Sequence, residues 1–410
     1  MTSPPAEPDL MPLQPWFTSL NELLIAHQHL WKRNPFQGPE QYAAALTDSQ
    51  IQTLETLRTD QAEKLQADDR LLFDYLGYAF PFAKAIRQLL DILPPAPTDS
   101  EVQAPLQEKY LTHVPGRKQE QIRYFAQMLS PIQQPMLDWC AGKAHLGRSL
   151  HRLCGHPVTA LEFDPELVRQ GQRLAAGMPI KWFCTDVMTT LPDGCLRPDL
   201  HSIALHACGD LHHRFLQVSA THRLERVSLA PCCYPKTQHT IYRPLSNLAQ
   251  QHGMTLSRED LKLAVRAPVT LSSAENNRRK HMQAWRLGFD LLQREVRDCA
   301  DYLPVPSLPT SVLAQPFSEF CATLAATKNL PLPASIDFDF YEEAGLARYE
   351  QVTRLDLVSS LFRRALELWL VLDLAMYLQE NGYAVTVQQF CPATITPRNL
   401  CIDARRKGEA

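Results

Sequence analysis

Residues 138–147 read DWCAGKAHLG, and this stretch decides the fold of the chain. It follows an apolar run and precedes a segment of helical length, which is where a nucleotide-binding fold has its glycine-rich loop. Such a loop needs residues without bulk where the backbone meets the ligand. Gly142 is present, and Cys140, Ala141 and Ala144 are small. By itself the stretch does not distinguish a cofactor loop from an ordinary strand–turn–helix junction.

Short apolar runs alternate with helix-length segments on both sides of this loop. This alternation predicts an α/β fold with a parallel sheet and covering helices. Ligands of such sheets bind outside the carboxyl ends of the strands, near the point where the strand order reverses. The runs are MLDWCA (136–141), VTALEFD (158–164), IKWFCTDV (180–187), HSIALHAC (201–208) and RVSLAPCCY (226–234).

The length of 410 residues predicts more than one domain, or one domain with large additions. Two further β-like runs near the C-terminus, AVTVQQF (384–390) and NLCIDARR (399–406), are expected to complete the sheet. We therefore expect an N-terminal helical region with a proline-rich linker (1–105), a core with the first five strands (106–270), a helical insertion (271–380) and the C-terminal strands (381–410).

Composition and charge exclude several classes. A net charge of −3 gives the whole chain no attraction for nucleic acid or anionic lipid. The first residues lack a basic start followed by an apolar core, and the longest apolar run is broken by Glu367 and Asp373. Eleven cysteines without a C-x-x-C pair indicate reduced thiols. We expect a cytoplasmic protein with no membrane partner.

Acidic residues close three successive strands. Glu162 follows the loop by about twenty residues, the spacing at which an acidic side chain accepts the hydroxyls of a ribose. Asp186 could accept from an adenine amino group, and its alternative role is that of a turn residue. Asp138 disfavours a phosphate but suits the ammonium of an amino-acid group. Together they predict S-adenosyl-L-methionine as the cofactor, with Phe163 and Val187 beside it.

Asp164 follows at the same strand end. It could serve the ligand or, alternatively, be the N-cap of the next helix, before Pro165 at the first helical turn.

The fourth and fifth strands bring further polar residues to the same edge. His206, Cys208 and Asp210 alternate along HSIALHACGDL and therefore share a side while the strand is extended. Tyr234 ends the fifth strand, in PCCY. We expect both strand ends to open onto the rim beside the transferable methyl group, with Cys208 and Tyr234 facing the substrate.

Cys232 and Cys233 complete the predicted substrate wall. Three cysteines near a histidine could also indicate a metal site. Adjacent cysteines do not easily bind one tetrahedral ion together, however, and the usual paired spacing is absent. The sequence therefore favours cysteines that line a wall over a metal site.

At these residues the chain resembles a methyltransferase-like family with a D-x-x-A-G-K-G-H-L motif. That family includes the ribosomal RNA adenine dimethylase domain-containing and the glutathione S-transferase C-terminal domain-containing proteins. The resemblance covers about residues 110–235 and 365–407. The matching pieces are DWCAGKAHLG, LHACGDL, APCCY and YLQENGY…TPRN, and RKQEQI (117–122) resembles the family's K-K-x-H-E-[VI] lead-in.

The resemblance implies a class I methyltransferase, with a Rossmann-like sheet of seven strands, the last antiparallel, and S-adenosylmethionine in the crevice. It places Glu162 on the ribose position, Asp186 on the adenine position and His206–Asp210 beside the methyl group. Ala144 stands where the family usually has glycine, and its methyl group could narrow the pocket. The residues that fall on the first cofactor motif are Asp138, Cys140, Ala141, Gly142 and Lys143.

Methyl transfer is an in-line displacement at an activated carbon, so positioning supplies much of the rate. A base is needed only for a protonated acceptor. The candidates are Asp210, which could instead cap its helix, and His206, whose charge change lies near pH 7 and which could instead be a hydrogen-bonding wall residue.

The size of the helical additions indicates a macromolecular acceptor, RNA or protein. The basic stretches 278–280 and 405–407, and Arg286, could contact phosphates or simply be solvated. The alternative function is a non-catalytic cofactor-fold protein that acts as an RNA or ribosome assembly factor. A nucleotide-dependent oxidoreductase would need a glycine-rich phosphate turn, which the sequence lacks.

Overall fold

The computed structural model describes residues 12–98, 106, 108–266 and 273–408. The chain forms two compact units. The sheet unit contains residues 1–25, 86–266 and 363–410, and the helical unit contains residues 26–85 and 267–362. This grouping differs from the boundaries expected at 105 and 380, because residues 12–25 and 86–98 of the first predicted segment, and residues 363–380 of the second, belong to the sheet unit. Residues 99–105 of the predicted linker and the expected boundary at 270 lie outside the described residues.

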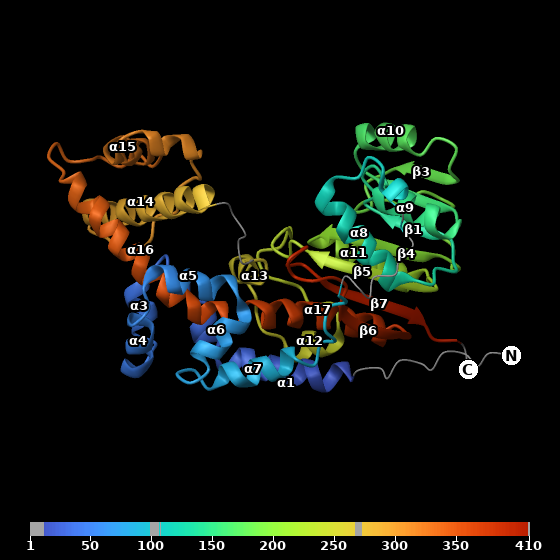
Figure 1. The fold of residues 1–410 in the computed structure, drawn as a ribbon, viewed down its shortest axis with the longest axis horizontal. Coiled ribbons are helices and arrows are strands. Elements are labelled where there is room, and N and C mark those ends of the chain that lie inside the picture. Colours follow the sequence, from blue (N-terminus) through green and yellow to red (C-terminus); the bar gives the residue numbers. More distant parts are fainter. Residues whose placement is uncertain (1–11, 99–105, 107, 267–272, 409–410) are drawn as a thin grey trace. The chain divides into compact units, whose positions relative to one another are not determined.

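The sheet has seven strands in the order β3-β2-β1-β4-β5-β7-β6 (Figure 1). The first five strands are parallel, and β7 is antiparallel to both β5 and β6. This confirms the predicted α/β class, with seven strands and the last one antiparallel. The strands are β1 (Met136–Trp139), β2 (Val158–Glu162), β3 (Ile180–Cys184), β4 (His201–Cys208), β5 (Arg226–Cys232), β6 (Tyr383–Gln389) and β7 (Leu400–Arg406).

Strand β1 shows why its residues form the centre of this sheet. All four are buried, and alternate side chains point to opposite faces. Asp138 contacts the backbone of Gly147, in a helix on one face, whereas Trp139 packs edge-on against Phe215, in another helix, at 5.6 Å between ring centroids. A strand covered on both faces reads as a continuous apolar run, which is how it appears in the sequence.

The helices of the sheet unit lie before and between the strands in the sequence. Phe125 of α8 and Leu150 of α9 belong to one apolar core with Met136 and Val158 of the sheet. The helices are α1 (Leu13–Ala26), α7 (Phe82–Leu90, which begins in the helical unit), the short 3₁₀ helix η1 (Glu108–Leu111), α8 (Gly116–Leu129), α9 (His145–Cys154), α10 (Pro165–Leu174), α11 (Asp210–Thr221), α12 (Asn247–His252), α13 (Arg258–Ala264) and α17 (Arg363–Glu380).

A buried ion pair ties the C-terminal strand to the rest of the sheet. The guanidinium of Arg226 donates from Nε and Nη2 to the two carboxylate oxygens of Asp403, both at 3.0 Å. It also donates to the carbonyl of Leu129, and Ser228 donates to Asp403. Arg226 is only 2% exposed, so the charge of Asp403 on β7 compensates a buried cation on β5.

The P-R-N stretch near the C-terminus anchors helix α17. Arg398 and Arg364 both pair with the buried carboxylate of Glu367, at 3.3 and 2.6 Å. Asn399 accepts from Arg364 and donates to the carbonyl of Cys391. These contacts explain why α17 belongs to the sheet unit although it follows a long helical segment in the sequence.

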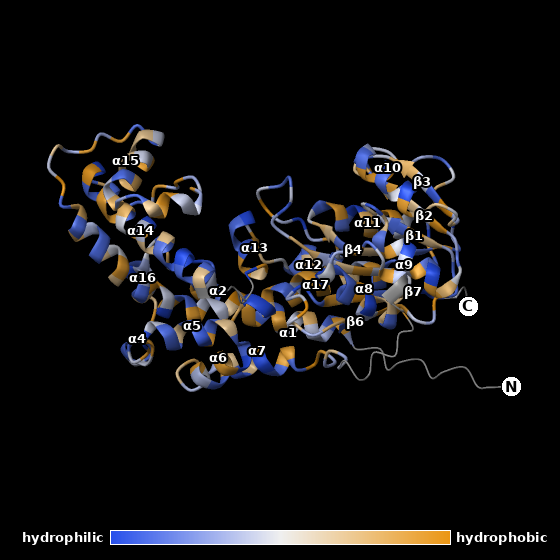
Figure 2. Cartoon of the chain, turned by 45° about the horizontal axis from the view of Figure 1, so that its top comes forward, coloured by the Kyte–Doolittle hydropathy of each residue, from blue (hydrophilic) through white to orange (hydrophobic). Residues whose placement is uncertain are grey.

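The helical unit has its own core around two long helices that cross closely. A Cβ atom on Gly345 of α16 would lie 2.5 Å from the carbonyl oxygen of Ala284 in α14, and one on Gly288 would lie 2.4 Å from that of Tyr341. Hydrophilic and hydrophobic residues alternate along both helices (Figure 2). The helices of this unit are α2 (Gln28–Trp31), α3 (Pro39–Ala43), α4 (Asp48–Glu55), α5 (Thr59–Ala67), α6 (Asp69–Leu76), α14 (Ser273–Arg297), η2 (Thr310–Ala314), α15 (Phe317–Thr327) and α16 (Phe338–Ser360).

Within the described ranges, none of the helices combines the length and apolar character needed to cross a bilayer.

Candidate functional site

The backbone turns through left-handed conformations at the carboxyl ends of β1, β4 and β5, which are neighbours in the sheet. Such conformations cost about 1–3 kcal/mol for a residue other than glycine, and they cluster where a structure places functional groups. The sheet order also reverses between β1 and β4, the usual position of a ligand crevice. The non-glycine residues with positive φ at this rim are Cys140 (53°), Ala144 (49°), His206 (69°) and Cys233 (49°).

Ala144 illustrates why the family motif has glycine at this position. Its φ of 49° and ψ of 41° place it in the left-handed helical region, immediately before α9. An L side chain adopts this region at a cost of about 1–2 kcal/mol, whereas glycine does so freely. The Ala144 side chain is buried in a small cluster with Ala141 and Ala160. The departure from the motif therefore adds backbone strain at a fully packed site.

Glu162 holds the loop after β1. One carboxylate oxygen accepts from the backbone N–H of Gly142 at 2.7 Å, and the other accepts from that of Asp164 at 2.9 Å. A carboxylate has about four lone-pair sites, so about two remain for a ligand. Asp164 caps α10, as its alternative role predicts, by accepting from the N–H of Glu166 at 2.7 Å, and Pro165 occupies the first helical position.

Asp138 lies under the same loop and is buried. Its carboxylate accepts from the backbone N–H of Gly147 at 3.0 Å. A Cβ atom at Gly147 would come within 2.8 Å of that oxygen, so the contact requires glycine. Burial raises the pKa of Asp138 to about 6, against the opposing effects of the Gly147 N–H and the positive charge of Lys118. A contact of Asp138 with the ammonium of a ligand stays a prediction.

The turn after β3 contains the third predicted carboxylate. Asp186 accepts from the backbone N–H of Met188 at 2.9 Å, the contact expected of a turn residue. Val187 is buried, and its carbonyl accepts from Arg214. Phe163, at the end of β2, is 70% exposed. Phe163 therefore presents an exposed aromatic surface, whereas the side chain of Val187 lies inside the protein.

The charges of the three carboxylates all act on the thiol of Cys140. Burial is the largest cause of the rise in the pKa of this thiol to about 12, and the charges of Glu162, Asp138, Cys208 and Asp186 raise it further. Groups from the ends of β1, β2, β3 and β4 therefore lie within electrostatic range of one loop residue. Lys143 is the charged residue of the loop 140–143, and its side chain is half-buried.

His206 lies where β4 shifts its register against β5. Its Nε2 donates to Oε1 of Gln121 in α8 at 3.0 Å. Burial, and then the charge of Lys118, lower the pKa of His206 to about 4. The imidazole is therefore neutral near pH 7, and the titration argument that indicated a base does not hold in this environment. A neutral His206 retains Nδ1 as an acceptor.

Sequence reasoning did not select Lys118 or Gln121 as site residues. Both lie on α8, which precedes β1 and brings them to the carboxyl ends of the strands. Burial lowers the pKa of Lys118, and Asp138 opposes that shift. The signal that could have identified them is the RKQEQI lead-in, which resembles a motif of the family.

Asp210 begins α11 and joins two strand ends. The residue at the cap position is Gly209, and Asp210 accepts from the backbone N–H of Gln238, beyond β5, at 2.8 Å. A Cβ atom at Gly209 would lie 1.6 Å from the carbonyl oxygen of Lys236. The turn after β4 is therefore packed directly against the segment after β5.

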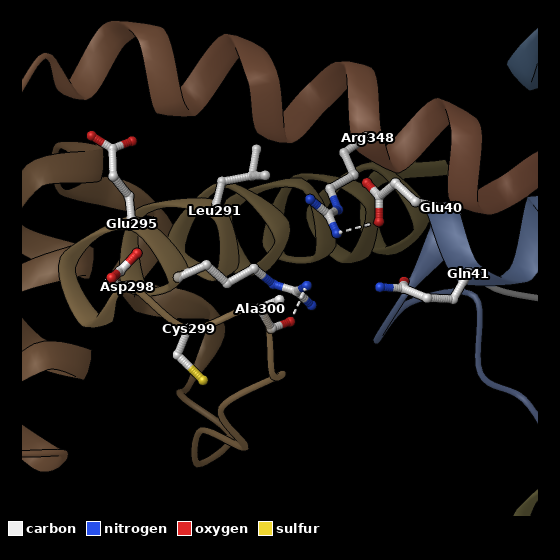
Figure 3. A pocket seen from close by; sticks show the side chains of 9 residues that line it. Glu40, Gln41, Leu291, Glu295, Asp298, Cys299, Ala300 and Arg348 are labelled. Atoms are coloured by element: carbon white, nitrogen blue, oxygen red, sulfur yellow. Dashed lines mark hydrogen bonds and ion pairs between the residues drawn. The ribbon is translucent and has the colours of Figure 1, made fainter.

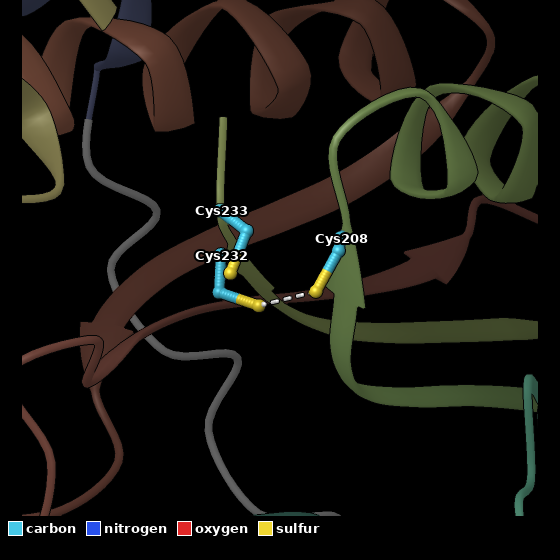
Figure 4. A group of neighbouring side chains, drawn as sticks. All are labelled: Cys208, Cys232 and Cys233. Carbon is cyan, nitrogen blue, oxygen red and sulfur yellow. Dashed lines mark hydrogen bonds between the residues drawn. The ribbon is translucent and has the colours of Figure 1, made fainter. Parts of the chain in front are cut away.

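The predicted substrate wall divides into two groups. The thiols of Cys208, Cys232 and Cys233 face one another, with Sγ of Cys208 and Sγ of Cys232 3.4 Å apart (Figure 4). Tyr234 is 2% exposed, and its hydroxyl has no hydrogen-bond partner within the described ranges. Burial, and then the charge of Glu367, raise the pKa of Tyr234. Cys208 and Cys233 are half-buried and Cys232 is buried beside them, whereas Tyr234 lies inside the core.

A cavity with a volume of about 720 Å³ lies in the helical unit (Figure 3). Arg348 pairs there with Glu40 at 3.3 Å, and Arg294 pairs with Asp290 at 2.8 Å. The predicted basic stretch on α14 is divided: Arg278 and Arg279 are exposed, but Lys280 pairs with Glu63 and Arg286 donates to a backbone carbonyl.

One family model and several solved structures are similar to parts of this chain. Residues 117–240 match a family model described as a methyltransferase domain. The glycopeptide N-methyltransferase MtfA is 18% identical over 40% of this chain and 70% of that chain, with a TM-score of 0.23. The plantazolicin methyltransferase BpumL, in complex with SAH, is 11% identical over 85% of this chain and 98% of that chain, with a TM-score of 0.24. No curated protein matches the chain.

The sheet order and the matched domain define the chain as a class I methyltransferase. Its cofactor is S-adenosyl-L-methionine, and the matched residues contain every strand end described above. The match begins at Arg117, so it includes the part of α8 that carries Lys118 and Gln121.

Proposed function

We propose that the chain transfers a methyl group from S-adenosylmethionine to a macromolecular acceptor, RNA or protein, and that it belongs to the methyltransferase-like family it resembles. One observation carries the proposal: Glu162 and Asp138 both bind the backbone of the segment after β1, through the N–H groups of Gly142 and Gly147, and the charge of Asp186 reaches the same loop. An adenosyl ligand with a cationic sulfur and an amino-acid tail has hydroxyl and amino groups that suit such acceptors.

The residues divide the binding task by position. Glu162, with about two lone-pair sites free, accepts from the ribose hydroxyls, and Asp186 accepts from the adenine amino group. The loop residues 140–143 pass along the ligand, and Phe163 and Val187 flank the base. The charge of Lys118 acts on Asp138, so the two groups suit the carboxylate and the ammonium of an amino-acid ligand.

Positioning is the main catalytic contribution of the protein. The bound cofactor supplies a methyl group on a positively charged sulfur, and no bond within the protein is made or broken. Holding the acceptor in line can contribute up to about 7–11 kcal/mol to lowering the barrier. A neutral His206 accepts a hydrogen bond at Nδ1 and so helps to orient an acceptor, and Asp210 is the candidate base for an acceptor that carries a proton.

A macromolecular acceptor is supported by the helical unit. This unit has its own apolar core, and none of the seven named strands of the sheet lies in its described residues. Exposed Arg278 and Arg279 on α14 provide charges for a polyanion or an acidic protein surface.

Methyl transfer from tritiated S-adenosylmethionine to a fractionated lysate of a deletion strain tests the proposal. We expect label in the RNA or the protein fraction, and label only in small molecules would contradict a macromolecular acceptor. The alternative function is that of a non-catalytic cofactor-fold protein. Calorimetry with the cofactor tests it, because a folded chain that neither binds the cofactor nor transfers label would support this alternative.

The Asp210→Ala variant separates catalysis from structure. As a base, Asp210 affects turnover more than cofactor affinity. A loss of affinity or stability with normal turnover would instead assign it only the contact with Gln238.

A further inference from the structure

Three thiols meet at the rim where β4 and β5 end. Cys208 is the last residue of β4, Cys232 is the last residue of β5, and Cys233 follows it. Their Sγ atoms all lie within 4.8 Å of one another, and those of Cys208 and Cys232 are 3.4 Å apart (Figure 4). Tetrahedral zinc with bonds of about 2.3 Å places its sulfur ligands about 3.8 Å apart. The spread of the three thiols is close to that requirement.

The backbone explains how two adjacent cysteines reach one point. In an extended strand, neighbouring side chains point to opposite faces. Cys233 instead has a φ of 49°, so the chain leaves the strand geometry directly after Cys232 and returns the second side chain to the same side. The shift of β4 register between Leu205 and Cys208 sets the third thiol opposite them. The unusual backbone conformations at these turns therefore bring the three thiols together.

The cluster offers a cation three sulfur ligands at one point. A metal binds cysteine as the thiolate, so an ion held by all three residues displaces their protons, and its affinity falls as the pH falls.

We propose that Cys208, Cys232 and Cys233 bind one zinc ion through three thiolates. Zinc is the divalent ion that thiolate ligands favour in a tetrahedral site. No fourth histidine, cysteine or carboxylate joins the cluster within the described ranges, so the fourth coordination position is open. Zinc sites with an open position are the catalytic rather than the structural kind.

The proposal is independent of the acceptor and of the cofactor, and it can be tested on the full chain without an activity assay. The protein is purified without chelator, and its zinc is counted by elemental mass spectrometry. We expect about one zinc per chain. Replacement with Co²⁺ is expected to give the charge-transfer and visible bands of tetrahedral thiolate coordination.

Single serine variants assign the ligands. Loss of a residue that only supports a metal ligand weakens binding by about 10- to 100-fold. Cys208→Ser and Cys233→Ser remove ligands themselves, so we expect them to weaken zinc binding by more than about 100-fold. Cys184→Ser is the matched control, because that thiol is exposed at the end of β3 and outside the cluster. Circular dichroism measures whether each variant is folded. Cys233 is half-buried, so its replacement removes a ligand without leaving a cavity in the core.

Three outcomes would overturn the proposal. The first is a folded chain with neither zinc nor a cobalt spectrum. The second is zinc that every cluster variant retains, and the third is a Cys208–Cys232 disulfide in protein purified under reducing conditions. Calorimetry with S-adenosylmethionine on the same samples reports on the proposed methyltransferase function separately.

Discussion

Replacement of Glu162 by glutamine tests the site through a change of one atom. In the structure both carboxylate oxygens accept backbone N–H groups, from Gly142 at 2.7 Å and from Asp164 at 2.9 Å. Glutamine keeps the size and one carbonyl oxygen, but its NH₂ group must face one of these two donors. A hydrogen bond to a charged group contributes about 1.5–3 kcal/mol net. We therefore expect the free energy of unfolding to fall by about that amount.

The same change removes a charged acceptor from the ribose site. If Glu162 accepts from the ribose, the loss of about 1.5–3 kcal/mol corresponds to cofactor binding that is weaker by about 10- to 150-fold. Isothermal titration calorimetry with S-adenosylmethionine measures this affinity, and denaturant unfolding measures the stability. Glu166→Gln is the control, because that carboxylate is exposed on α10 and pairs with Arg169. It should change neither quantity measurably.

Unchanged cofactor affinity in folded Glu162→Gln protein would refute the ribose assignment. Unchanged stability would refute the argument that this carboxylate holds the loop.

Three further predictions concern stability. Asp403→Ala leaves the buried Arg226 cation without its partner, so denaturant unfolding should show a loss of about 3–5 kcal/mol, and a loss below about 1 kcal/mol would contradict it. Gly209→Ala places a Cβ atom against the carbonyl of Lys236 at a positive φ; we expect a loss of about 3 kcal/mol or more, and a normal melting temperature would show that the turn can relax. Asp138 has a pKa raised to about 6, so the folded state binds its proton more tightly than the unfolded state does. Wild-type stability should therefore fall by about 3 kcal/mol relative to Asp138→Asn between about pH 4 and pH 6, and parallel pH profiles would exclude this contribution.

The sequence predicts the sheet well because strands buried on both faces leave a continuous apolar signal. All seven strands fall within one residue of a predicted run, and the antiparallel last strand is what the resemblance implies. The sequence did not predict which helices belong to which unit. Helix α17 looks like the end of a helical insertion, but Glu367 is bound by Arg398, which comes from the segment between the last two strands. Periodicity reports a buried face and not its partner.

The site was predictable in part. Acidic strand ends indicate a common crevice because parallel strands end at one edge, and Cys140 experiences the charges of Asp138, Glu162 and Asp186. The neutral state of His206 was not accessible, since burial and the approach of Lys118 depend on the fold. The sequence also predicts that the ends of the fourth and fifth strands meet, but it does not predict the turn at Cys233, with a φ of 49°, that brings the side chains of adjacent cysteines to one side.

The place of β7 between β5 and β6 has a consequence for synthesis on the ribosome. Strand β6 pairs with β7 and with no other named strand, so these two form a hairpin that docks onto β5 as one piece. Until residues 400–406 leave the exit tunnel, β5 presents an open edge with unpaired backbone groups. Nascent chains shorter than this are therefore the species most exposed to aggregation, and chaperone capture should persist until the hairpin emerges.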